Sequence, residues 1–380
     1  MDCDLTREMR DLGQTVLVLQ GGGALGAYQL GVYEALHEAG VEPDWVIGTS
    51  IGAINAAIIA GNAPADRMDR LRAFWDRMEQ AELFGAPSSW WGLVARNMAT
   101  MATGLPAFFR PNPAAFAGPL VPLGPEAAGY YSTAPLRDTL SDLIDFDRIA
   151  AGETRLTVGA SSVSDARMRY FDSRDSRLTL DHVMASGALP PAFPAVRIEG
   201  RLYWDGGILS NTPLEVVFDD LPRRDALVFA VHIWNPHGPE PGSIWQVLNR
   251  LKDLQYSSRA ESHIRRHRQI HRLRHVVAEL AARLPPELRE PPEIAALGAH
   301  GCLTRMHVVR LIAPALENET HMKDIDFSPE GIRQRWDAGY RHTMATLERA
   351  PWRDPHDPED GLILHEACGG EPVATAAAAE

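Results

Sequence analysis

Two short apolar segments, each followed by a tight turn and a helical pattern, open the chain and constrain its fold most. Residues 15–20 are β-branched and aliphatic and lead into three glycines, after which residues 25–39 have apolar side chains at helical spacing. Residues 45–48 form a second buried-strand pattern, and residues 51–60 follow as an apolar helix of small residues. Because helical crossovers join parallel strands, we predict an α/β fold in three layers with a mainly parallel sheet.

The composition is that of a globular protein and excludes several functions. The chain has 380 residues, of which 45% are hydrophobic and 23% charged, and its formal net charge of −13 argues against a nucleic-acid binder. Three well-separated cysteines support neither a disulfide framework nor a zinc ribbon. The N-terminus is acidic, and the first apolar run, 16–19, is too short for a secretory signal or a membrane span. We therefore expect a cytoplasmic protein.

The sequence divides into four parts. Residues 1–14 are a lead, and residues 15–220 form the α/β domain, within which residues 84–132 are a variable insertion rich in glycine, proline and aromatic side chains. Residues 221–350 are predicted to hold the last core strand and a mainly helical C-terminal extension. Residues 351–380 turn to Asp, Pro, Gly and Ala, which predicts a flexible tail.

Within residues 221–350, residues 227–233 have the pattern of a strand. Residues 243–284 have the pattern of one or two long polar helices, residues 305–313 that of a late strand, and residues 329–349 that of a late helix.

A G-x-S-x-G motif, Gly48-Thr49-Ser50-Ile51-Gly52, lies where the second strand turns into a helix. The glycines allow a tight turn that exposes the serine hydroxyl at the helix N-terminus, where free N–H groups favour developing negative charge. The alternative is a glycine-flanked serine that only caps the helix.

Gly21-Gly22-Gly23-Ala24-Leu25-Gly26 follows the first strand and matches G-x-G-x-x-G. Dinucleotide binding needs an acidic residue at the end of the second strand, whereas Asp44 precedes that strand, so we expect no nucleotide cofactor. The loop still offers unhindered backbone N–H groups that could hold an oxyanion. A tight turn with close helix–strand packing is the alternative.

A third motif, Asp205-Gly206-Gly207, follows an apolar strand at residues 202–204. By itself it is typical of a hairpin turn. In combination, the glycine loop, the serine turn and this aspartate resemble the patatin-like phospholipase family. Residues 185–194 and Asn211-Thr212-Pro213 also fit that family.

The resemblance implies a patatin-like fold and a Ser–Asp dyad, with Ser50 as nucleophile and Asp205 as general base, and no histidine. It implies an acyl-enzyme and hydrolysis of carboxylic esters of lipids, and the region after residue 218 looks like the C-terminal extension of a bacterial subgroup. The residues assigned in this way are Gly21, Gly22, Gly23 and Ala24 for the oxyanion hole and Gly26, Gly48, Gly52, Gly206 and Gly207 for the turns. Two alternatives stay open: an esterase for short or polyester substrates, and a non-catalytic scaffold that binds lipid or a partner.

One position departs from the family. The glycine loop of the family commonly carries Arg or Lys before its last glycine, where this chain has Leu25. A cation there could receive a phosphate-bearing substrate, so its loss favours a carboxylic ester hydrolase over a phospholipase.

Two further segments suggest contact with lipid. Residues 90–116 are rich in Trp and Phe and could form a lid or a membrane-facing entrance, or else an insertion packed on the body. His263, His267, His271 and His275 recur every four residues beside a basic run at residues 265–274. We expect no metal there, because no carboxylate or cysteine is paired with the histidines. The basic run predicts peripheral contact with an anionic membrane at its inner face, stronger at acidic pH, and a solvated helix face is the alternative.

Overall fold

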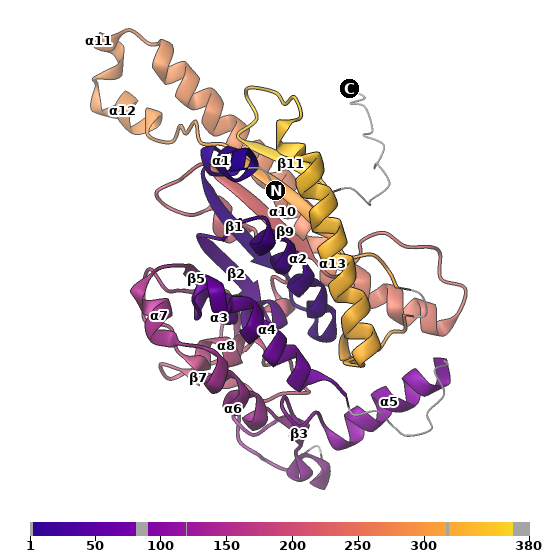
Figure 1. Ribbon diagram of the computed structural model, residues 1–380. Helices are drawn as coiled ribbons and strands as arrows, with labels where there is room; N and C mark the ends of the chain where they lie inside the picture. The colour runs from indigo at the N-terminus through magenta and orange to yellow at the C-terminus, as the bar shows by residue number, and fades with distance from the viewer. Residues whose placement is uncertain (1–2, 81–89, 119, 317–318, 368–380) are drawn as a thin grey trace.

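The computed structural model describes residues 3–80, 90–118, 120–316 and 319–367, and these residues contain a nine-stranded and a two-stranded sheet (Figure 1). The strand order of the large sheet is β11-β10-β9-β1-β2-β5-β8-β7, with β6 beside β5. The strands are β1 Gln14–Leu19, β2 Trp45–Thr49, β3 Arg110–Pro111, β4 Tyr131–Ser132, β5 Arg155–Ser162, β6 Met168–Asp172, β7 Val196–Ile198, β8 Arg201–Asp205, β9 Ala226–His232, β10 Met306–Ile312 and β11 Leu362–Glu366.

Helices cover both faces of the large sheet. The α-helices are α1 Cys3–Asp11, α2 Ala27–Glu38, α3 Ile51–Ala60, α4 Pro64–Met78, α5 Trp90–Thr103, α6 Ala134–Leu143, α7 Phe146–Ala151, α8 Leu180–Ser186, α9 Glu215–Phe218, α10 Ile244–Arg283, α11 Pro286–Arg289, α12 Pro292–Gly298 and α13 Pro329–Arg349. The 3-10 turns are η1 Gly23–Gly26, η2 Pro113–Ala117, η3 Gly206–Ile208, η4 Lys323–Ile325 and η5 Pro351–Arg353. None of the described helices is both long and apolar enough to cross a membrane.

Alternate side chains of β1 enter two different cores, which defines the three layers. Leu17 and Leu19 pack into the core shared with α2, α3, α4 and α13. Val16 and Val18 pack into the core on the other face, with side chains of α9 and α10. Both faces of this strand are therefore buried, which is why it reads as a continuous apolar run.

The six strands from β11 to β5 are parallel, so their carboxyl ends lie at one edge of the sheet. Leu19 at the end of β1 is in register with Gly48 near the end of β2. This register brings the glycine loop after β1 beside the serine turn after β2. The antiparallel strand β8 joins β5 through Asp205 and Ala160 and brings the aspartate to the same region.

The three-layer α/β fold and the mainly parallel sheet are confirmed, and the helical pattern of residues 243–284 is one helix, α10, of 40 residues. The strands predicted at residues 227–233 and 305–313 are present as β9 and β10, and β11 continues the sheet beyond them. The insertion contains the helix α5, which its weak periodicity did not predict, and residues 84–89 and 119 lie outside the described residues.

The flexible tail predicted from residue 351 is wrong for its first part. Trp352 in η5 is buried, and Leu362 begins β11, which pairs in parallel with β10. The strand β11 is short and follows an Asp- and Pro-rich stretch, so its local sequence does not indicate a strand. It forms because the distant strand β10 offers it a partner in the sheet. Residues 368–380 of the predicted tail lie outside the described residues.

The extension docks on the domain through two helices that touch backbone to backbone. A Cβ added to Gly31 of α2 would lie 2.0 Å from the carbonyl oxygen of Trp336, and one added to Gly339 of α13 would lie 2.0 Å from that of Tyr28. Gly31 of α2 thus packs on the backbone of α13, and Gly339 of α13 packs on the backbone of α2. A side chain at either position would push the two helices apart.

We expect Gly31→Ala to destabilise the protein by about 2 kcal/mol, because overpacking outweighs the gain in helix propensity. Urea unfolding measures this loss. Gly298→Ala in α12 is the matched control, since its Cβ would meet Ala281 at an ordinary 3.5 Å, and it should be neutral or stabilising. Equal stability changes in the two variants would contradict direct packing of α13 on α2.

Candidate active site

Ser50 occupies a strained turn between β2 and α3. Its backbone has φ 56° and ψ −126°, a conformation that L residues rarely adopt. The turn is possible because glycines flank it: a Cβ on Gly48 would lie 2.3 Å from the carbonyl oxygen of Gly52, and one on Gly52 would lie 2.2 Å from that of Leu19. The helix therefore starts directly against the ends of β1 and β2 and carries Ser50 at its N-terminus.

A buried hydroxyl holds the backbone of this turn. Ser186, at the end of α8, accepts a hydrogen bond from the Ser50 N–H at 3.0 Å and donates one to the carbonyl of Gly159 at 2.6 Å. Ser186 thus links the turn to β5. The sequence indicated residues 185–194 through family resemblance alone, and no spacing or motif identified this contact.

Asp205 lies at the end of β8 and is 2% exposed. Its carboxylate accepts a hydrogen bond from the Gly207 N–H at 2.7 Å, and both Asp205 and Ser50 line the same cavity. Burial raises the pKa of Asp205 to about 6, and the nearby Ser50 hydroxyl and the Gly207 N–H oppose this shift without cancelling it. The structure thus joins the serine and the aspartate of two distant motifs.

Some residues of the glycine loop are used in packing and backbone hydrogen bonds, and others line the cavity beside Ser50. The Gly21 N–H donates to the carbonyl of Asn211 at 3.2 Å, so the predicted donor role of Gly21 in the oxyanion hole is wrong. Gly22 and Gly23 line the cavity beside Ser50, and their N–H groups have no hydrogen-bond acceptor among the described residues. Ala24 is fully buried and is not part of the cavity wall, which leaves two of the four predicted donors facing the cavity.

The other motif glycines pack tightly. Gly23 has φ +56°, and a Cβ there would lie 2.2 Å from the carbonyl oxygen of Asp324, so glycine is required. A Cβ on Gly26 would lie 2.7 Å from Ile51, and one on Gly206 would lie 2.5 Å from the carbonyl oxygen of Gly159.

A cavity of about 220 Å³ opens over Ser50 and Asp205. Most of its wall is apolar or aromatic, from Met101, Phe108, Phe109, Tyr131, Leu189, Phe193, Trp234, Tyr256, Ile325 and Phe327. The cavity therefore offers an apolar chain a place next to two polar side chains and two free backbone donors.

The C-terminal extension forms part of this wall, which sequence reasoning missed. Tyr256 of α10 stacks on Trp234 with ring centroids 4.9 Å apart, and the Trp234 indole N–H donates to the carbonyl of Gly21 at 2.7 Å. The side-chain amide of Gln20 donates to the carbonyl of Tyr256 at 3.3 Å. The loop after β1 is thus fastened to a helix more than two hundred residues away in the sequence.

Two of the four histidines on α10, His271 and His275, are buried. Burial lowers the pKa of His267 below its ordinary value and that of His271 to about 4. His267 packs on the ring of Phe218 in α9. His267 and His271 therefore do not supply the charge at mildly acidic pH on which the expected increase in membrane binding depends.

The basic run is partly neutralised. Arg268 forms an ion pair with Asp360 at 2.8 Å, and Arg272 lies 3.2 Å from Glu359. These acids belong to the segment before β11, so part of the predicted membrane-binding charge holds the C-terminal strand instead. The side chains of Trp90 and Trp91, predicted to face lipid, lie outside the described part of the structure.

Comparison with known proteins identifies two matched regions. The profile described as patatin-like phospholipase matches residues 17–218, and a profile described as patatin phospholipase matches residues 254–359. A lysophospholipase of Aspergillus niger is 26% identical over 243 residues, which cover 62% of this chain and 13% of that protein. The human patatin-like phospholipase domain-containing protein 6 is 46% identical over 74 residues, or 19% of this chain and 5% of that protein. The chain thus spans a small part of the length of these relatives.

Two solved structures cover most of the chain at low similarity. VipD from Legionella pneumophila has a TM-score of 0.38 and 16% identity, covering 88% of this chain and 67% of its own. The ExoU–SpcU complex of Pseudomonas aeruginosa has a TM-score of 0.33 and 15% identity, covering 88% of this chain and 51% of the other.

We expect Asp205→Asn to stabilise the fold at pH 8 and to change it little at pH 4. Since the folded pKa of about 6 exceeds the ordinary 3.8, the carboxyl group contributes stability at low pH that is lost as the pH rises through 6. About two pKa units correspond to about 3 kcal/mol, an upper limit for the gain from a neutral amide. Urea unfolding at both pH values measures it.

Asp69→Asn is the control, because the side chain of Asp69 is 82% exposed. It should show no such dependence on pH. A loss of stability in Asp205→Asn at pH 8 would contradict the raised pKa.

Proposed function

Because this chain belongs to the patatin-like phospholipase family, we propose that it hydrolyses carboxylic ester bonds of lipids with Ser50 as nucleophile and Asp205 as general base. The observation that carries the proposal is that Ser50 lies close enough to the buried Asp205 to lower its pKa, and that both side chains line one largely apolar cavity. A serine hydroxyl is a weak nucleophile until a base takes its proton, and Asp205 is the base within reach.

In the first half of the reaction, Ser50 Oγ attacks the ester carbonyl carbon while Asp205 accepts the hydroxyl proton. The carbonyl oxygen becomes an oxyanion, for which the N–H groups of Gly22 and Gly23 are the donors on the cavity wall. When the tetrahedral intermediate collapses, the bond to the alcohol breaks and Asp205 returns its proton to the leaving oxygen. The acyl group stays on Ser50.

In the second half, water replaces the alcohol. Asp205 accepts a proton from the water as its oxygen attacks the acyl carbon, and the same donors hold the second oxyanion. Collapse releases the carboxylic acid and returns the proton to Ser50. One carboxylate serves both halves, so no histidine is needed.

The apolar cavity favours an acyl chain as the part of the substrate bound beside Ser50. Phe108, Phe109 and Phe193 form a cluster of rings along its wall, with centroids 5.7–6.0 Å apart. Rings at this spacing pack against methylene groups and exclude water from the reacting ester. A lipid ester fits this wall better than a short polar ester.

We further propose that the protein meets lipid surfaces as a peripheral protein, through apolar side chains rather than through its basic run. Both α5 and α10 supply residues to the cavity wall, and both expose large apolar side chains. These side chains, 41–75% exposed, are Met98 and Met101 on α5 and Ile244, Trp245, Val247, Leu248, Leu251 and Leu254 on α10. The start of α10 lies on the same side of the molecule as α5, and its far end lies near α11 and α12 (Figure 1).

Ser50→Ala and Asp205→Asn are each expected to lower kcat/KM for a p-nitrophenyl ester by at least about a thousandfold, with the fold intact. The double variant should be no worse than either single one, because the two side chains act as one unit. A fluorophosphonate should label the wild type and not Ser50→Ala. Ser141→Ala, at an exposed position of α6, is the control.

Near-normal activity of Asp205→Asn would contradict the dyad. A wild type that hydrolysed neither p-nitrophenyl esters nor phospholipids and took no label would favour the non-catalytic scaffold. Turnover of short esters without any lipid would favour the short-ester enzyme.

The pH dependence of kcat/KM should have an acidic limb near pH 6. The base works as the carboxylate, and below its pKa of about 6 the ionised fraction falls about tenfold per pH unit. Rates from about pH 3 to 8 on a substrate that does not ionise measure the limb. A limb near the ordinary value of 3.8 would mean that Asp205 is solvated during catalysis.

Leu251→Ser/Leu254→Ser should weaken binding to phospholipid vesicles about tenfold or more, because two aliphatic side chains leave the lipid interface. Co-sedimentation with neutral and anionic vesicles measures binding. The matched control is Leu273→Ser/Leu280→Ser on the same helix, where the side chains are 64% and 60% exposed but far from α5.

Arg265→Gln/Arg266→Gln tests the electrostatic alternative. Suppose that this arginine variant no longer bound anionic vesicles, whereas Leu251→Ser/Leu254→Ser still did. The apolar surface would then be excluded as the membrane-binding site. A second copy of the chain on the apolar surface would show instead as a dimer that the leucine change dissociates.

A further inference from the structure

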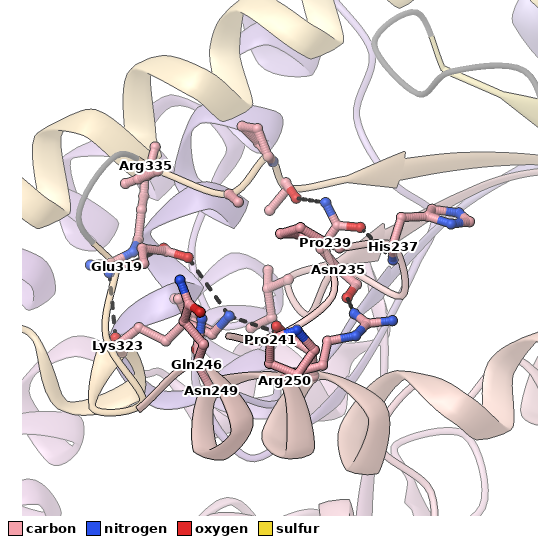
Figure 2. A pocket seen from close by; sticks show the side chains of 18 of the residues that line it. Asn235, His237, Pro239, Pro241, Gln246, Asn249, Arg250, Glu319, Lys323 and Arg335 are labelled. Carbon is pink, nitrogen blue, oxygen red and sulfur yellow. Dashed lines mark hydrogen bonds and ion pairs between the residues drawn. The ribbon is translucent and has the colours of Figure 1, made fainter. Parts of the chain in front are cut away.

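A second cavity, of about 250 Å³, is lined in part by Leu25 of the glycine loop. Figure 2 shows this cavity from close by. It is enclosed by the segment after β9, the first turns of α10, the segment after β10 and Arg335 of α13. Glu319 and Lys323 lie on one side of it, and Asn235 and Arg250 on the other. None of these residues belongs to the serine–aspartate site.

The cavity is lined by charges of both signs in equal number. The cations are Arg250, Lys323 and Arg335, and the acids are Asp253, Glu319 and, at the exposed rim, Glu240. Lys323 and Asp253 satisfy each other at 2.7 Å. The other charges have no such close partner in the cavity: Arg250 donates to the backbone carbonyls of Asn235 and Pro236.

Two buried polar atoms in this cavity lack a hydrogen-bond partner, and a third group is held only by long ion pairs. Glu319 lies 3.7 Å from Lys323 and 3.6 Å from Arg335. Burial raises the pKa of Glu319 despite these two cations. Arg335 is 4% exposed, and its Nε, like Oδ1 of Asn249, has no hydrogen-bond partner among the described residues. Buried polar atoms are normally bonded, so these atoms indicate a ligand or water that donates and accepts.

We propose that this cavity binds a phosphate–ammonium zwitterion, the chemistry of an ethanolamine phospholipid headgroup, with the phosphate toward Arg250 on one side and the ammonium toward Glu319 and Asn249 on the other. A simple anion would meet Glu319 and Asp253, and a simple cation would meet Lys323 and Arg335. A zwitterion places each charge against its opposite, and its ammonium can donate a hydrogen bond to the unpartnered Oδ1 of Asn249.

The two cavities share one wall. Gly21, Gly22 and Gly23 line the catalytic cavity, whereas Leu25 of the same loop lines the second one. Lys323 faces the second cavity, and the next residue, Asp324, lines the first. The position where the family commonly carries a cation therefore faces a cavity that receives its cations from α10, η4 and α13.

The bound zwitterion could be a free, deacylated headgroup or the headgroup of an intact lipid. The second of these rests on the proposed function, because the lipid would then be the substrate. For the free source, we expect sn-glycero-3-phosphoethanolamine to bind in calorimetry to the wild type and to Ser50→Ala alike. Glycerol 3-phosphate, which is only anionic, and ethanolamine, which is only cationic, should bind at least about tenfold more weakly, because each lacks the group that makes the second charge-assisted contact. For the lipid source, KM for phosphatidylethanolamine should be lower than that for phosphatidylglycerol.

Glu319→Gln keeps the side-chain shape and should weaken the zwitterion about tenfold, and Asn249→Trp, which fills the rim, should abolish binding. Glu330→Gln on exposed α13 surface is the matched control, and thermal midpoints show that each variant is folded. Equal binding of glycerol 3-phosphate would overturn the zwitterion in favour of a simple anion site. If calorimetry detected no binding and the KM values showed no difference that depends on Glu319, the site would be overturned altogether. If the protein hydrolysed no lipid at all, the proposed function would fail, but calorimetric binding of sn-glycero-3-phosphoethanolamine would still test the site.

Discussion

The site depends on how closely α3 approaches the ends of β1 and β2. A Cβ on Gly52 would lie 2.2 Å from the carbonyl oxygen of Leu19, so the helix starts where a side chain could not fit. That contact forces Ser50 into φ 56° and aims its side chain out of the turn. The strain is stabilised by packing around it and by Ser186, which bonds the Ser50 N–H. The position of Ser50 is thus a consequence of backbone packing.

The extension is part of the site as well as of the sheet. Gln20, at the end of β1, accepts the N–H groups of Ile233 at 2.6 Å and Trp234 at 2.9 Å, and donates to Thr212 at 2.7 Å and to Tyr256. One buried amide therefore joins the glycine loop, the segment after β9 and α10. A buried polar network of this kind fixes one arrangement, because each broken bond would leave an unsatisfied group. The cavity wall and the C-terminal region consequently form together.

The sequence predicts what depends on local pattern. The strand–helix order, the glycine loop and the serine turn are local, and the structure has them where they were expected. Family resemblance paired Ser50 with Asp205, which no spacing could do. The contacts that local pattern could not indicate are those between distant segments: Gly31 with Trp336, Tyr256 with Trp234, and β11 with β10. The prediction of a charged histidine face failed for the same reason. The spacing of the histidines identified one face of a helix, but it could not show that Phe218 of α9 packs on His267 and His271.

Burial of Asp205 suits it to the role of base that we propose, without a histidine. An aspartate at its ordinary pKa of 3.8 binds a proton too weakly to draw one from a serine hydroxyl efficiently. Removing it from water destabilises the ionised form and raises its pKa to about 6, which makes it the stronger base. The apolar wall that keeps water from the carboxylate is also the wall against which the proposed acyl chain would pack. In the proposed reaction, basicity and substrate preference therefore arise from one feature, a dry cavity, at a cost in folding stability at neutral pH.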